Sequence, residues 1–180
     1  RRHTRSFHVT GVQTCALPIW ENESASSLGL VHCESIAARS RLHNWEIRPH
    51  RHHGLFQLIW LEQGRADCWL DESREEISGS SVLLLPQHCV HGFQFSTDAR
   101  GLVVTMAYSV LDNLGAGIAD ELSRATAYKL CRLQGAGIRV ESALRELQAE
   151  YDGDGRHRLA LLNAWLSCSF GWLLRQEADA

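Results

Sequence analysis

The sequence lacks a concentration of positive charge. Its 18 lysine and arginine residues are outnumbered by 21 aspartate and glutamate residues, the formal net charge is −3, and the arginines are spread along the chain. A protein that binds nucleic acid needs a basic face, because it must attract the phosphate backbone. The charge balance therefore argues against nucleic-acid binding by this chain.

The chain also lacks a Cys-x-x-Cys pair and a long uninterrupted apolar run. Six cysteines are present, and an odd number remains once Cys15 is set aside with the leader described below. An odd number without a paired motif favours reduced thiols in a cytoplasmic protein over a disulfide framework. The longest apolar run, residues 159–174, is interrupted by Asn163 and small polar residues, so it is too short and mixed to span a bilayer.

The N-terminal segment does not resemble the rest of the chain. Residues 9–19 resemble the translation of a common sequencing-adapter oligonucleotide. A targeting segment is the alternative, but Gly11, Gln13 and Thr14 interrupt the apolar core that a secretory signal requires. We therefore expect residues 1–19 to be an artefactual leader and exclude them from the fold prediction.

The middle of the sequence has the pattern of a β-protein. Short segments rich in apolar and β-branched residues recur about every ten residues, with turn-forming residues between them. These segments are residues 45–48, 55–61, 65–70, 75–77, 82–85, 90–95 and 102–108. Ser35 can cap a short helix that runs through Leu42, ahead of the first strand. Short strands at this spacing predict a sandwich or a barrel.

The pattern becomes helical from about Asp112. A weak helix is expected over residues 118–130, and a second helix has apolar residues that recur from Val140 to Tyr151. A last helix over residues 156–176 is apolar over most of its surface. The sequence therefore predicts a helical segment after the strands.

The last helix has more apolar surface than one contact can cover. One face can pack on the barrel or on the preceding helix, whereas a second face, with Trp165 and Trp172, would stay exposed in a monomer. A large exposed apolar patch is unusual in a monomer, so we expect a homodimer through these helices. The alternative is that both faces are buried inside one subunit.

Four polar residues of the β region are spaced to meet. His50 and His52 are two residues apart, so in a strand they point to the same side. Gln57 lies five residues after His52, so in one continuous strand it would point to the opposite side. A turn or bulge must therefore come between them, and Gly54 can supply it. His91 begins another strand after an apolar run and a turn. Three imidazoles and an amide around one concavity predict a binding site.

These residues resemble the two cupin motifs. The matching residues are, in order, His50, His52, Gln57 and Gly64 for the first motif, and Gly79, Pro86 and His91 for the second. The chain departs from the motifs in having Gln57 where glutamate is usual and His88 where glycine is usual. From about Val31 onward, the sequence resembles the N-terminal effector-binding and dimerisation domain of AraC-type transcriptional regulators, in particular the subgroup that senses hydroxylated aromatic acids.

The resemblance implies a mainly β fold with C-terminal helices. A cupin barrel (a double-stranded β-helix, or jelly roll) is expected over residues 20–110, and two or three α-helices in a dimerisation segment over residues 111–180. Regulators of this family carry a helix-turn-helix DNA-binding domain after the sensor domain, and no such domain fits before Ala180. The chain is therefore expected to be truncated and to reach DNA only through the missing domain.

The resemblance also implies a small aromatic carboxylate as effector, such as 4-hydroxybenzoate or hydroxyphenylacetate, with no cofactor and no catalysis. Arg48 is expected to pair with the carboxylate through its planar guanidinium, unless it forms a surface salt bridge with Glu46 or Glu62. The histidines and the glutamine would read the ring hydroxyl, and apolar side chains would cover the ring. The expected ligand-binding residues are Arg48, His50, His52, Gln57, His91, Phe93 and Met106.

Two other functions stay open. His50, His52, Gln57 and His91 also have the character of a nickel, iron or zinc ligand set, as in a metal-dependent cupin dioxygenase or isomerase. Gln57 is a weak neutral ligand, which favours the sensor. The other alternative is a plain dimerisation module whose barrel is filled by its own side chains. Stoichiometric bound metal would favour the enzyme, and a cavity too small for a benzene ring would favour the module.

Overall fold

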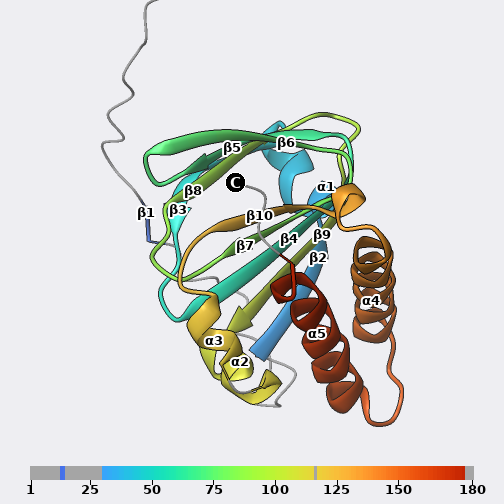
Figure 1. Ribbon diagram of the computed structural model, residues 1–180. Helices are drawn as coiled ribbons and strands as arrows, with labels where there is room; N and C mark the ends of the chain where they lie inside the picture. The colour runs from blue at the N-terminus through green and yellow to red at the C-terminus, as the bar shows by residue number, and fades with distance from the viewer. Residues whose placement is uncertain (1–12, 15–29, 116, 177–180) are drawn as a thin grey trace, which may run out of the picture.

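The computed structural model describes residues 13–14, 30–115 and 117–176, in which two five-stranded sheets face each other (Figure 1). The first sheet contains, in spatial order, β1 (Gln13–Thr14), β3 (Glu46–Arg51), β8 (His91–Phe95), β5 (Arg65–Leu70) and β6 (Ser73–Ser78). The second contains β10 (Thr126–Lys129), β7 (Ser81–Leu85), β4 (Leu55–Gln63), β9 (Arg100–Ala107) and β2 (Val31–Ser35). The predicted jelly-roll fold with C-terminal helices is confirmed.

The helices are, in chain order, α1 (Ile36–Ser40), the 3-10 helix η3 (Arg41–His43), α2 (Tyr108–Leu114), α3 (Ile118–Glu121), the 3-10 helix η4 (Leu130–Arg132), α4 (Gly135–Asp152) and α5 (Arg158–Leu174). Helices α2 and α3 lie at one end of the barrel and α4 and α5 cover the outer face of the second sheet, whereas α1 packs on the core between the sheets (Figure 1). None of the helices that the structure describes is long and apolar enough to cross a membrane. The two long helices match the two predicted from apolar periodicity.

Strand β4 separates two apolar cores. It is buried on both sides from Phe56 to Leu61, as the near-continuous apolar run predicts. Because side chains alternate along a strand, Leu58 packs with the helices on the outer face, whereas Ile59 packs into the space between the two sheets. The polar residues of the site share this inner space with the second core.

The predicted helix over residues 118–130 is wrong. Within this range only Ile118–Glu121 is α-helical, and Thr126–Lys129 form β10, which pairs antiparallel with β7 and places Tyr128 opposite Val82. Tyr128 is only 4% exposed. Burial of this side chain and pairing of the open edge of β7 override the weak local preference for helix.

The N-terminal leader contributes two described residues. Gln13 and Thr14 form β1, which runs parallel to β3 with Gln13 opposite His50. The rest of residues 1–19 lies outside the described part of the chain, so the prediction that this segment is foreign to the domain stays a prediction.

Candidate functional site

Three imidazoles from separate places in the sequence meet between the sheets. His50 lies in β3, His52 follows that strand directly, and His91 begins β8. They are 8%, 3% and 1% exposed, and their ring centroids are 4.4–5.3 Å apart. One ring nitrogen of each lies within 4.8 Å of the others. The cluster that the motif spacing predicts is therefore formed by the fold.

A β-bulge brings His50 into the cluster. Ile47 pairs with Phe93 and His50 pairs with His91, so β3 advances by three residues where β8 advances by two. In a regular strand, Ile47 and His50 would point to opposite sides of the sheet, because they are three positions apart. The extra residue of the bulge lets both side chains face the space between the sheets. Gly92 allows the close approach, since a Cβ atom there would lie 2.9 Å from the Pro49 nitrogen.

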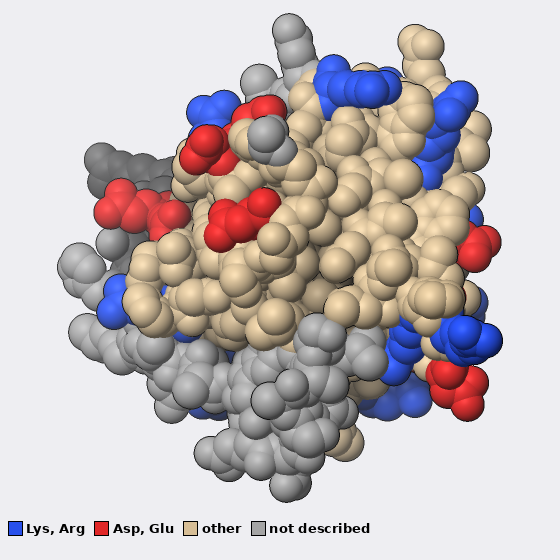
Figure 2. Space-filling model, turned by 90° about the horizontal axis from the view of Figure 1, so that it is seen from below, with Lys and Arg blue, Asp and Glu red and all other residues tan. Residues whose placement is uncertain are grey.

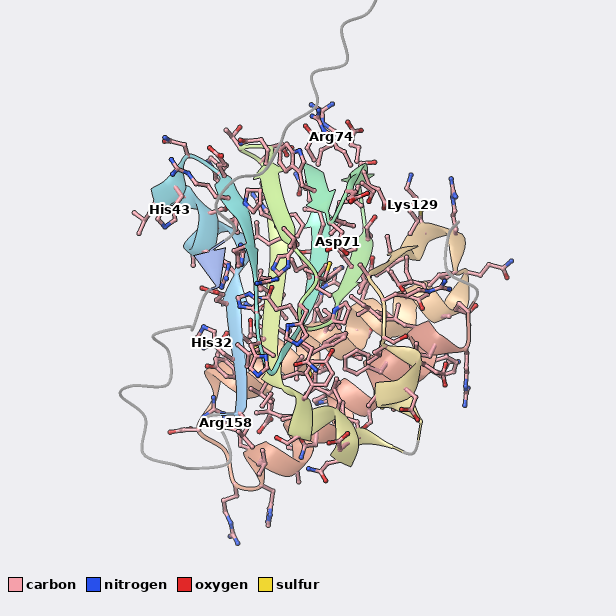
Figure 3. The ribbon with its side chains drawn as sticks, turned by 90° about the vertical axis from the view of Figure 1, so that its left-hand side faces the viewer. His32, His43, Asp71, Arg74, Lys129 and Arg158 are labelled. Carbon is pink, nitrogen blue, oxygen red and sulfur yellow. The ribbon has the colours of Figure 1, made fainter. Side chains whose placement is uncertain are left out.

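The loop before His91 is anchored by Asp71 in the turn between β5 and β6 (Figure 3). The Val90 N–H donates to the Asp71 carboxylate at 2.9 Å, and the Asp71 N–H donates to the Val90 carbonyl at 2.7 Å. Two hydrogen bonds on the preceding residue fix where β8 begins. His91 is thereby held at the wall of the barrel and not at its surface.

Two of the imidazoles are held neutral with a defined tautomer. Burial lowers the pKa of His91 from 6.5 to about 3, and burial also lowers the pKa of His50. The His50 Nδ1–H donates to the Arg48 carbonyl at 2.8 Å, and the His91 Nδ1–H donates to the Cys89 carbonyl at 2.9 Å. A carbonyl oxygen only accepts, so in each neutral ring Nε2 carries a lone pair.

The Nε2 atom of His91 is the unusual atom of the site. It is buried, and among the described residues no donor bonds to it. A buried acceptor that has no partner is rare in proteins and marks a place where another group can bind. A hydroxyl of an organic molecule or a metal ion would each satisfy it.

Gln57 lies on the second sheet and faces the same interior. It is 2% exposed, and its Nε2 donates to the Thr105 hydroxyl at 3.0 Å across the β4–β9 pair. Thr105 in turn lies opposite His32 on β2. A row of polar residues therefore crosses the inner face of the second sheet.

Phe93 is placed as predicted, whereas Met106 is not. Phe93 is 1% exposed between the sheets, and its ring centroid is 6.0 Å from that of His91. Met106 follows Thr105 on β9 and so points the other way, into the core beneath the helices. The prediction that Met106 lines the site is therefore corrected.

The structure does not bring Arg48 to the imidazoles. Its side chain is exposed, because the bulge in β3 that turns His50 inward leaves Arg48 on the outer surface. Only its backbone carbonyl contributes, as the acceptor for His50. The expected position of Arg48 beside the ligand is corrected by this placement.

Arg39 is the cation that the sequence reasoning missed. It lies on α1, pairs through Nη1 with the Glu34 carboxylate, and its side chain is 16% exposed. Besides burial, the main cause, the positive charge of Arg39 lowers the pKa of His50 and of His91. Arg39 lies three residues after the buried Ile36 and therefore on the same face of the helix. This spacing is the feature of the sequence from which its inward orientation could have been predicted.

The three histidines are also of the residue type that binds metal ions. Metal-binding histidines usually donate their second ring nitrogen to a carbonyl or carboxylate, as His50 and His91 do here. The nitrogens around zinc are about 3.3 Å apart for bonds of 2.0–2.1 Å. The separation of up to 4.8 Å is wider, so the rings would have to close on an ion.

Comparisons with known proteins agree with this architecture. A family model described as the AraC-like ligand binding domain matches residues 32–165. No curated protein matched the sequence. The structure of an apo variant of ToxT from Vibrio cholerae is similar with a TM-score of 0.51 at 14% identity, over 81% of this chain and 55% of that one. This likeness supports the fold.

Two further structures are similar over a smaller share of this chain. The AraC-like transcriptional activator CuxR gives a TM-score of 0.49 at 10% identity, over 71% of this chain and 44% of that one. An RmlC-like cupin from Shewanella frigidimarina gives 0.29 at 19% identity, over 34% of this chain and 54% of that one. The chain spans about half the length of the two regulators. Since the family model covers most of the sequence, the chain belongs to the family of AraC-like ligand-binding domains.

Proposed function

We propose that the barrel binds a small aromatic carboxylate, such as 4-hydroxybenzoate or 4-hydroxyphenylacetate, as the effector of this sensing domain. The observation that carries the proposal is the buried Nε2 lone pair of His91, which has no donor within the described residues. A buried polar atom without a partner costs about 1–3 kcal/mol. A ring hydroxyl that donates to this atom removes the cost, so the site favours a hydroxylated guest.

The other inner residues support the same pose. His50, His52 and Gln57 surround the hydroxyl from both sheets, and Phe93 offers apolar surface next to His91. No catalysis is proposed. The signal is a coupling free energy, because the effector can only act by binding one arrangement of the domain more tightly than another.

A thermal-shift screen over hydroxybenzoates and hydroxyphenylacetates tests the proposal. At a concentration 100 times its Kd, a ligand stabilises the folded state by about 2.7 kcal/mol, which for a domain of this size raises Tm by roughly 5–10 °C. Benzoate without the hydroxyl is the matched control and should give a smaller shift. Unchanged Tm with every acid in the panel would contradict the proposal.

We also propose a homodimer through α4 and α5. Ile138 on α4 and Leu161 on α5 are 69% and 42% exposed, and Trp165 and Trp172 on α5 remain partly exposed. Light scattering should give twice the monomer mass, and Leu161→Glu should return the protein to a monomer.

DNA binding belongs, in this proposal, to a helix-turn-helix domain of a longer cytoplasmic regulator. Among the described residues on the face that Figure 2 shows, lysine and arginine side chains are interspersed with aspartate and glutamate and form no continuous basic patch. This supports a sensing role for the chain, with DNA reached through another domain. The chain by itself should not retard a DNA fragment in a gel at physiological salt.

A metal-dependent cupin enzyme, a dioxygenase or isomerase, is the second candidate. It is favoured by the three histidine nitrogens within 4.8 Å of one another, with Gln57 on the facing sheet. A bound ion would supply Lewis-acid or redox chemistry. Elemental analysis after dialysis decides between the candidates: stoichiometric nickel, iron or zinc together with no effector shift favours the enzyme.

A further inference from the structure

Arg39 is directed into the barrel by the way α1 begins. The Ala38 N–H donates to the Ser35 hydroxyl at 3.0 Å, which caps the helix directly after β2. Ile36 is fully buried in the core between the sheets, and Arg39 follows it by three residues, so both lie on one face of the helix. The helix therefore carries the guanidinium toward the inner space, where it is 16% exposed.

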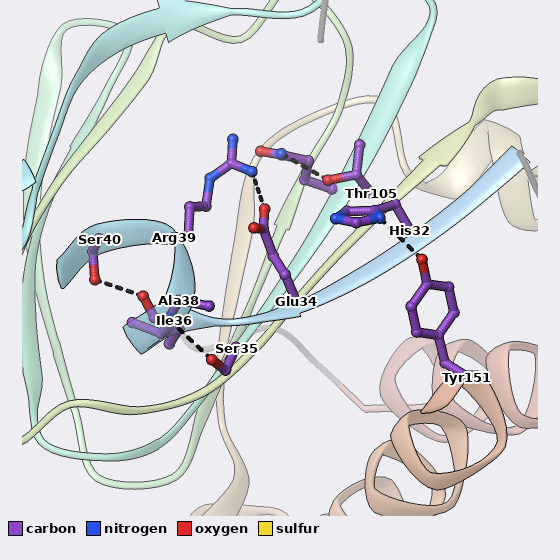
Figure 4. A network of polar contacts seen from close by, with 10 residues as sticks. His32, Glu34, Ser35, Ile36, Ala38, Arg39, Ser40, Thr105 and Tyr151 are labelled. Carbon is purple, nitrogen blue, oxygen red and sulfur yellow. Dashed lines mark hydrogen bonds and ion pairs between the residues drawn. The ribbon is translucent and has the colours of Figure 1, made fainter. Parts of the chain in front are cut away.

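The partner of Arg39 faces the same space. Glu34 lies opposite Val103 on β9, and Val103 is part of the core between the sheets. The next inward residue on β9 is Thr105, which holds Gln57. Figure 4 shows Arg39, Glu34 and Thr105 in this arrangement. The ion pair thus borders the polar row that leads to the imidazoles.

Glu34 uses only part of the guanidinium. Among the described residues its contact is with Nη1, whereas arginine presents five N–H donors in a planar fork that suits two oxygens at once. Glu34 is 22% exposed and so keeps access to water if it is displaced. In this ion pair, a carboxylate of the same chain occupies a guanidinium that could instead bind the carboxylate of a ligand.

We propose that Arg39, and not Arg48, pairs with the carboxylate of the effector, and that Glu34 occupies this arginine until the effector arrives. The inference rests on the proposed function, since it assigns a residue to each end of the same guest. The imidazoles take the hydroxyl end and Arg39 takes the acid end. Glu34 is then an internal competitor that sets the affinity.

The exchange happens on a strand that is also tied to the helices. His32 lies two residues before Glu34, and its Nδ1 atom is 3.0 Å from the hydroxyl of Tyr151 at the end of α4 (Figure 4). The guanidinium of Arg158 stacks on the same tyrosine ring, with its Cζ atom 5.1 Å from the ring centroid; Arg158 is labelled in Figure 3. Release of Glu34 therefore changes the contacts of β2, the strand through which the barrel meets α4 at this point.

Calorimetric titration with 4-hydroxybenzoate and with its uncharged amide, 4-hydroxybenzamide, tests the assignment. Arg39→Gln should weaken 4-hydroxybenzoate binding about tenfold or more, because a charge-assisted hydrogen-bond pair is lost, and should leave the amide unchanged. Glu34→Gln should tighten binding of the acid several-fold. Arg48→Gln is the matched control and should bind both ligands as the wild type does.

Each outcome has a separate meaning. Equal affinity of wild type and Arg39→Gln for the acid, or a tenfold loss in Arg48→Gln, overturns the assignment while the proposed function stands. Failure of the wild-type protein to bind any hydroxylated aromatic acid overturns the proposed function itself. If the unpaired Glu34 unfolds Arg39→Gln, the double variant Glu34→Gln/Arg39→Gln removes that charge and should show the same selective loss for the acid.

Discussion

His50 and His91 lie directly opposite each other on the antiparallel strands β3 and β8, with ring centroids 4.4 Å apart. Each donates its Nδ1–H to a carbonyl oxygen of its own chain segment. The second nitrogens therefore carry lone pairs in a space where positive charge is costly. This pair of neutral acceptors can therefore bind a hydrogen-bond donor or a metal ion, but not a further acceptor.

Replacement of His91 by leucine should separate stability from binding. Leucine removes a buried acceptor without a described partner but also removes the hydrogen bond to the Cys89 carbonyl, so we expect His91→Leu to change the free energy of unfolding by no more than about 1 kcal/mol. The same change should abolish the thermal shift by 4-hydroxybenzoate. His53→Leu, at an exposed histidine, is the matched control and should preserve the shift. Loss of several kcal/mol in His91→Leu would refute the assigned role.

Stability should fall in mild acid. Burial lowers the pKa of His91 to about 3 from 6.5, so between these values the unfolded chain binds a proton that the folded protein refuses. The contribution is complete above about pH 6.5 and decreases as the pH falls toward 3, by roughly 1–2 kcal/mol between pH 7 and pH 5. Urea unfolding of metal-free protein at both pH values measures it. His91→Leu should reduce the difference, and an unchanged difference would contradict the assignment.

Gly137 should tolerate no side chain, in contrast to Gly135 two residues earlier. A Cβ atom at Gly137 would lie 2.0 Å from the Leu130 carbonyl oxygen, whereas one at Gly135 meets nothing within 4 Å. We expect Gly137→Ala to lower the free energy of unfolding by about 1–3 kcal/mol through overpacking. Gly135→Ala should be neutral or stabilising by up to about 1 kcal/mol. Equal effects in denaturant unfolding would contradict the packing of η4 on α4.

Thiol labelling should report the proposed dimer. Burial raises the pKa of Cys33, Cys68 and Cys89 to about 12, so these thiols should resist alkylation at pH 8. Cys131 and Cys168 are exposed in the single chain. Cys168 lies on α5, so its labelling should slow relative to Cys131 as protein concentration rises. Mass spectrometry of labelled peptides measures the ratio, and a constant ratio would contradict dimerisation through α5.

The sequence by itself determined the elements whose signal is local. Alternation and turn residues fixed the strands of the barrel, and apolar periodicity fixed α4 and α5, because both patterns depend only on residues within a few positions of each other. The His-x-His pair and His91 were recognisable for the same reason. Their spacing is a property of two short segments.

Tertiary structure alone decided which arginine turns toward the space between the sheets and which side chains face the imidazoles. A bulge in β3, visible only in its pairing with β8, turned Arg48 outward, and the register of β9 sent Met106 toward the helices. The open edge of β7 made a strand of residues 126–129. Arg39 entered the barrel because α1 packs its Ile36 face between the sheets. Each outcome depends on contacts between segments far apart in the chain, and a local sequence pattern carries no information about such contacts.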